Sequence, residues 1–171
     1  GLQTRTDRER FEELLHVTID EETSFAKMNM LMDVLLAEGR RDEADSVTRL
    51  MLRLDPDNLG LRFALGNLLV DVDRVNDAAE IFQSVLDGIK ANPEQARNLD
   101  LAEILLAAAR NATRVEGGAE QAIAYFEELE LSYDVSTDVL AEHAAVLFAR
   151  GDLEAAAKLY ATSGTDITAH I

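Results

Sequence analysis

Small and large apolar residues recur at one interval along this 171-residue chain. When the segment that begins at Leu31 is shifted by 34 residues, Leu31 falls on Leu65 and Ala44 falls on Ala78. A fixed period of this length is typical of chains in which copies of one supersecondary unit stack on their neighbours. The period therefore restricts the fold to a repeat architecture.

The interval holds towards both ends of the repeated region and fails once in the middle. Ala122 and Ala156 are also 34 residues apart, whereas Ala78 and Ala122 are 44 residues apart. We interpret the longer interval as a structural irregularity and not as a missing repeat. Either a helix runs from about Pro93 into Ala107–Ala109, or a longer connection joins two units.

Each unit has the pattern of two amphipathic helices. Leu65 and Leu69 are spaced so that they share one helical face. Ala78, Phe82 and Val85 recur at the spacing of a second helical face. Because the turns between such helices are short and polar, we expect the two helices of a unit to pack antiparallel.

The two prolines mark the boundaries between units. Pro56 disfavours continuation of the helix before it, and Asp57 or Asn58 can cap the helix that follows. Asn92 and Pro93 repeat this pattern, with Asn92 as the predicted cap and Pro93 at the first helical position. These signals predict one helix pair before each proline.

The combined pattern resembles the tetratricopeptide repeat family, whose unit is a helix–turn–helix of 34 residues. Residues 59–92 carry its hallmarks, a Leu-Gly pair followed by a small alanine and an aromatic residue. Residues 25–58 and 137–164 carry most of them, while 103–134 departs from the pattern in its first helix. The resemblance covers 25–164.

The resemblance implies an all-α fold, a right-handed superhelical solenoid of antiparallel helix pairs. We expect about four helix-turn-helix units plus an N-terminal helix at 7–19, which is a cap or the remainder of a preceding repeat. The predicted segments are an N-terminal region at 1–24, a repeat domain at 25–164 with units at about 25–58, 59–92, 93–134 and 135–164, and a C-terminal tail at 165–171.

Small residues in such units occupy the points where the two helices cross. We therefore expect Gly66 and Ala78 to allow a close approach of their helices, with Phe82, Phe126 and Tyr160 filling the space against neighbouring helices. The glycine lowers helix propensity by about 1 kcal/mol relative to alanine, so packing must offset that loss.

Charge and composition exclude several classes of function. The formal net charge is −17, which repels nucleic acids and anionic membranes. The chain has no cysteine, and its apolar stretches are too short to span a bilayer, so we expect no membrane insertion. Gly1 is typical of a cleavage remnant. A soluble, cytoplasmic fragment is favoured, with a trimmed anchor or signal as the alternative.

Few residues form arrangements that could carry chemistry. His16 lies near Glu12, Glu13 and Asp20 at helical spacing, which is compatible with a divalent metal but is more typical of a solvated helix face. His143 replaces a buried leucine of the repeat pattern, so we predict a histidine packed between helices. No nucleophile–base arrangement is visible. We expect no catalysis, no cofactor and no metal.

Function in a solenoid follows from its shape. In the family, the first helices of the units line the concave side of the superhelix. The resemblance places eleven residues of this chain on that side. They are Asn29, Asp33, Leu36, Phe63, Asn67, Val70, Asp71, Asn111, Arg114, Ala145 and Phe148.

The predicted groove is apolar and amide-rich, with few cations. The sequence therefore predicts a protein-interaction scaffold that binds a peptide or helix carrying apolar anchors and positive charge. The alternative is a structural self-association domain that belongs to a larger, membrane-tethered protein. In that case the chain would form a homo-oligomer. Family members that bind the C-terminal carboxylates of chaperones use lysines and asparagines in the groove. Asp33 stands where such an asparagine is needed, so this ligand class is disfavoured.

Overall fold

The computed structural model describes residues 21–164, with side-chain surroundings from residue 26 onwards. The predicted helix at 7–19, the His16 group and the tail at 165–171 lie outside these residues. Within them the chain forms eight α-helices and one 3₁₀ helix, and no strand. The helices are α2 (Glu21–Ala37), α3 (Arg41–Leu54), α4 (Leu59–Asp71), α5 (Val75–Ala91), η1 (Pro93–Ala96), α6 (Leu101–Ala112), α7 (Ala119–Ser132), α8 (Thr137–Arg150) and α9 (Leu153–Ser163).

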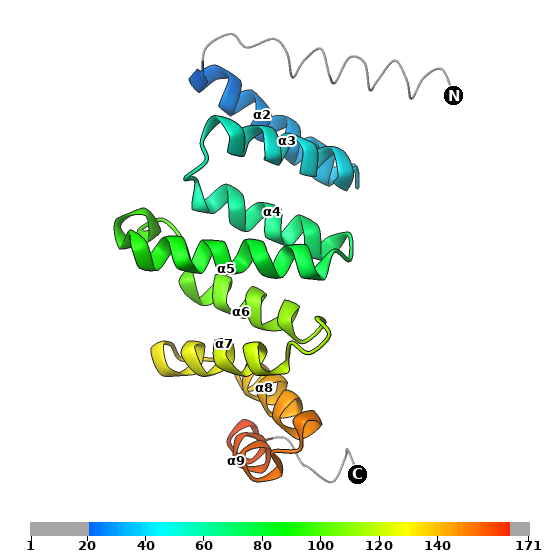
Figure 1. Ribbon diagram of the computed structural model, residues 1–171, viewed down its shortest axis with the longest axis vertical. Helices are drawn as coiled ribbons and strands as arrows, with labels where there is room; N and C mark the ends of the chain where they lie inside the picture. The colour runs from blue at the N-terminus through cyan, green and yellow to red at the C-terminus, as the bar shows by residue number, and fades with distance from the viewer. Residues whose placement is uncertain (1–20, 165–171) are drawn as a thin grey trace, which may run out of the picture.

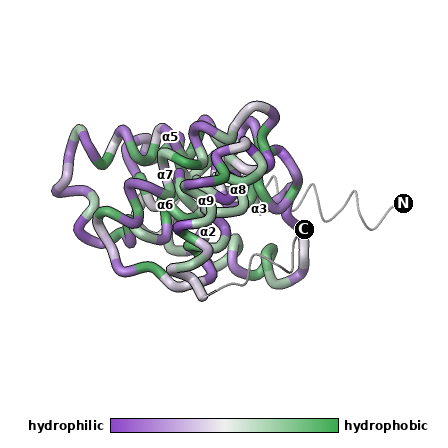
Figure 2. Tube along the Cα trace, turned by 90° about the horizontal axis from the view of Figure 1, so that it is seen from below, coloured by the Kyte–Doolittle hydropathy of each residue, from purple (hydrophilic) through white to green (hydrophobic). Residues whose placement is uncertain are grey.

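The helices stack in chain order, with α2 at one end of the stack and α9 at the other (Figure 1). Each of the pairs α2–α3, α4–α5, α6–α7 and α8–α9 packs tightly, and the second helix of a pair also packs on the first helix of the next pair. Figure 2 shows hydrophobic stretches among the packed helices and mainly hydrophilic turns on the outside. The architecture is the all-α solenoid of helix pairs that the sequence predicts.

Capping residues set where the first helices begin. The side chain of Asn58 accepts a hydrogen bond from the backbone N–H of Leu61 at 3.0 Å, which confirms the predicted cap. Asp100 caps α6 through the N–H of Glu103 in the same way. A glycine ends α8. Gly151 follows the last residue of this helix and adopts a left-handed conformation with φ of 93°, which glycine tolerates because glycine has no Cβ.

The irregular interval is a longer connection and not a longer helix. Pro93–Ala96 forms one short 3₁₀ turn, and α6 begins only at Leu101. The prediction of a helix running from Pro93 is therefore wrong, because Asp100 supplies a new cap that restarts the chain as a helix. The Asn92 side chain makes no capping hydrogen bond, so that predicted cap is also wrong.

The crossings of paired helices are filled by the predicted small residues. Ala78 and Ala122 are fully buried, and Ala156 is 1% exposed, which confirms their placement in the core. A Cβ built on Gly66 would lie only 2.5 Å from Cε1 of Phe82. The phenyl ring of α5 therefore occupies the space that a side chain on α4 would need.

Replacing Gly66 with alanine tests this contact. Alanine raises helix propensity by about 1 kcal/mol, but the methyl group displaces Phe82 and overpacking costs about 1–3 kcal/mol. We expect Gly66→Ala to lower the free energy of unfolding in urea. Gly60→Ala is the control, because its Cβ meets only ordinary contacts at 3.4 Å and beyond, and it should be neutral or stabilising. Equal stabilisation by both substitutions would contradict the packing described.

Candidate partner-binding surface

Two successive first helices, α4 and α6, are in direct contact. The second helices α5 and α7 border a cavity, where one hydrogen bond between their side chains joins them. We call the exposed surface of α2, α4, α6 and α8 the first-helix face. It holds most of the positions that the sequence predicts for partner binding.

On α2 the predicted residues reach solvent. Asp33 is exposed and Leu36 is 38% exposed, while Asn29 is half-buried. Sequence reasoning missed two apolar side chains of the same helix that are more exposed than Leu36, namely Met30 at 69% and Val34 at 52%. Their spacing of four residues places both side chains on one face of the helix, so the sequence pattern could have indicated an exposed apolar pair.

On α4 the predicted residues divide between core and surface. Phe63 is half-buried and its ring lies 5.9 Å from that of Phe82, so it is partly a core residue. Val70 also packs against the main core. Asn67 and Asp71 are exposed, and the Asp71 carboxylate lies 3.4 Å from the guanidinium of Arg41.

On α6 the structure corrects the prediction. Asn111 is only 2% exposed, and its side-chain amide donates a hydrogen bond to the carbonyl of Val75 at 2.9 Å. It therefore joins α6 to α5 and is not a groove residue. Arg114 lies beyond the end of α6 and pairs with Asp73 at 2.7 Å. The cause is the long turn at 113–118, which shifts the register obtained by counting back from α7.

On α8 both predicted residues are exposed, Phe148 at 46%. Ala145 lines a cavity of about 520 Å³ between α8 and the turn that joins α6 to α7. Val115, Val146 and Ala149 contribute further apolar walls. Sequence reasoning did not find this cavity. The adjacent glycines at 117–118 were a weak signal, because they mark a turn without bulky side chains.

The turn at this cavity depends on a glycine. A Cβ at Gly118 would collide with the backbone carbonyl oxygen of Ala112. Gly117 has a φ of 73°, in the left-handed region. The two residues let the chain fold back sharply and leave space beside α8.

His143 is a packing residue between helices, as the sequence predicts. It is 3% exposed, its ring stacks on Phe126 at 5.3 Å, and its Nδ1 lies 2.7 Å from a carboxylate oxygen of Glu130. The contacts join α8 to α7. Its Nε2 has no hydrogen-bond partner among residues 21–164.

One ion pair joins the successive first helices α6 and α8. Arg110 donates two hydrogen bonds to the Glu142 carboxylate, both at 2.8 Å, and this raises the pKa of the guanidinium. Such exposed pairs are worth about 0–1 kcal/mol because water and salt screen them. Such pairs hold neighbouring side chains in position, and they do not change the negative net charge of the chain.

The fold is that of tetratricopeptide repeat proteins. A crystal structure of the MamA protein superposes with a TM-score of 0.71 at 17% identity, covering 84% of this chain and 73% of MamA. A putative kinesin light chain of Podosopora anserina with nearly identical TPR-like repeats gives 0.68 at 17% identity, covering 94% and 87%.

A third structure, YrrB, is described as a TPR protein with an unusual peptide-binding site. It gives a TM-score of 0.65 at 15% identity, covering 81% of this chain and 66% of YrrB. No family model and no curated protein matches the sequence. Among residues 21–164, no helix has the length and apolar character needed to cross a bilayer.

The corrected role of Asn111 can be tested by its replacement with alanine. Loss of the buried hydrogen bond to Val75 should lower the free energy of unfolding by about 1 kcal/mol. Asn67→Ala is the matched control, since Asn67 is exposed on α4 and should tolerate the change. Denaturation in urea measures both. If Asn111→Ala were as stable as Asn67→Ala, the interhelical role would be wrong.

Proposed function

We propose that this chain is a protein-interaction scaffold that binds a peptide or helix of a partner along its first-helix face. The observation that carries the proposal is the region around α8. There an exposed aromatic side chain, Phe148, lies on the same helix as an apolar cavity large enough for a side chain.

The exposed residues form an extended path for a partner segment. Leu36 on α2 and Phe148 on α8 offer apolar contact towards the two ends of the stack, and Asn67 lies on α4 between them. Among the predicted residues, each first helix contributes at most two exposed side chains that a partner could contact. An elongated segment that spans several helices therefore suits it better than a compact ligand does.

Electrostatics favour a partner with positive charge. The chain carries a net charge of −17, and Asp33 forms no ion pair within the described residues. Attraction of this kind mainly raises the association rate and weakens as salt is added. Apolar anchors should set most of the lifetime of the complex.

Self-association is the second candidate function. It is favoured by Met30 and Val34, which expose two large apolar side chains on one face of α2. A second copy could bury them. This surface lies on α2, whereas the region that carries the main proposal lies around α8.

Peptides selected from a random library on the intact chain test the main proposal. We expect Phe148→Ala to raise their dissociation rate constant by about five- to thirtyfold, the usual effect of losing an aromatic anchor. Leu131→Ala is the control, because Leu131 is 88% exposed but lies on a second helix, α7. Dissociation is measured at chain concentrations where sedimentation gives a constant molecular mass, so that self-association does not contribute to the rates.

Two results would contradict the proposal. One is an unchanged dissociation rate in Phe148→Ala. The other is an equal loss in Leu131→Ala, which would place the bound peptide on the second helices.

A further inference from the structure

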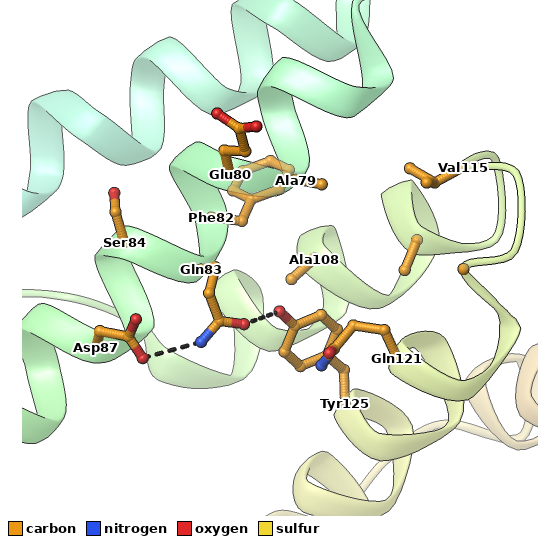
Figure 3. A pocket seen from close by; sticks show the side chains of 12 residues that line it. Ala79, Glu80, Phe82, Gln83, Ser84, Asp87, Ala108, Val115, Gln121 and Tyr125 are labelled. Atoms are coloured by element: carbon orange, nitrogen blue, oxygen red, sulfur yellow. Dashed lines mark hydrogen bonds between the residues drawn. The ribbon is translucent and has the colours of Figure 1, made fainter.

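A second cavity lies between the second helices α5 and α7 (Figure 3). Its volume is about 480 Å³, within the range of roughly 300–1,000 Å³ found for binding pockets. Helix α6 forms its floor through Ala108 and Ala112. The cavity residues on α5 and α7 lie outside the first-helix face, and this cavity shares only Val115 and Gly118 of the turn with the cavity beside α8.

The inner part of the cavity is apolar. Ala79, Ala108 and Val115 line it, and the small alanines leave space that larger side chains would fill. An apolar side chain or a methylene chain could therefore bury its surface here.

A chain of hydrogen bonds crosses the cavity from α7 to α5. The Tyr125 hydroxyl donates to Oε1 of Gln83 at 2.6 Å, and Nε2 of Gln83 donates to Oδ1 of Asp87 at 2.9 Å (Figure 3). These bonds use the hydroxyl proton and one amide proton inside the protein. The groups left for a ligand are mainly acceptors, above all Oδ2 of Asp87, which has no partner in the described part of the chain.

The charge around the cavity is negative. Its lining includes Glu80 and Asp87 but neither lysine nor arginine. Burial raises the pKa of the Tyr125 hydroxyl, and the charges of Asp87 and Glu128 raise it further. A tyrosine hydroxyl is protonated at neutral pH in any case, and these effects keep it protonated and donating to Gln83 at higher pH as well.

We propose that this cavity binds an arginine side chain of a partner peptide together with an adjoining apolar residue. The apolar floor accepts the adjoining residue and the methylenes of the arginine stem. The guanidinium meets the free oxygen of Asp87 and the acceptor lone pairs of Tyr125. A planar group with five donors matches several acceptors at once, which the compact ammonium of lysine does less well.

Capped tetrapeptides provide a direct test on the intact chain. The probe is Ac-Gly-Phe-Arg-Gly-NH₂, compared with peptides that carry citrulline, lysine or glutamate in place of arginine. Citrulline keeps the shape of arginine but removes its charge. Chemical shifts of the Gln83 side-chain amide and the Tyr125 ring report occupancy. We expect the arginine peptide to bind about two- to fivefold more tightly than the citrulline peptide.

Variants of the chain separate charge from shape. Asp87→Asn keeps the acceptor for Gln83 and should weaken the arginine peptide by about three- to fivefold while leaving the citrulline peptide unchanged. Ala79→Leu should fill the cavity and abolish binding of both. Asp77→Asn is the control, because Asp77 lies on the same helix, pairs with Arg74 and does not line the cavity.

Four results would overturn the proposal. They are no binding at millimolar peptide, equal binding of the citrulline and arginine peptides, equal binding of the lysine and arginine peptides, and an equal effect of Asp87→Asn and Asp77→Asn. Because none of these variants touches α8, a failure here leaves the proposed function of the first-helix face open to its own test.

Discussion

The contact between the backbone of Gly66 and the ring of Phe82 sets the distance between α4 and α5. With no Cβ at that point, the aromatic ring lies directly on the first helix. Ala78 makes the same approach possible from the second helix, where it is fully buried. Close-packed interiors leave little tolerance at such a point, since one added methylene displaces its neighbours. The spacing of the helix pair is therefore determined by two small residues.

The spacing within pairs determines what the rest of the solenoid can do. Tight pairs stack through the second helix of one pair and the first helix of the next. Helix α4 then contacts α6, while α5 and α7 border a cavity over α6. The same packing thus creates two different surfaces. One is the first-helix face with exposed side chains such as Phe148, and the other is a cavity bordered by Asp87 and Tyr125.

Much of this fold could be predicted from periodicity because the packing rule is local. The alanines at the crossings, the Asn58 cap and the buried histidine at position 143 each follow from one repeated pattern. The irregular interval was located correctly but interpreted in part wrongly. A proline at the first helical position is compatible with both a long helix and a single 3₁₀ turn. The long helix does not form here, because α6 begins at a new cap, Asp100.

The binding surfaces were harder to predict, since they depend on turn length and on distant helices. Counting back from Ala122 placed Asn111 in the groove, but the turn at 113–118 shifts that register and the side chain is buried. The cavity beside Tyr125 needs three helices at once, with Gln83 and Tyr125 far apart in sequence. A local sequence pattern therefore cannot predict that these side chains line one cavity.

The central claim is that small residues at the crossings hold the helix pairs together, and it can be tested on one helix. Ala122→Leu and Ala124→Leu add the same atoms to α7, at a fully buried and at an exposed position. Urea denaturation should show a loss of about 1–3 kcal/mol for Ala122→Leu and almost none for Ala124→Leu. Equal stability of the two variants would contradict the account.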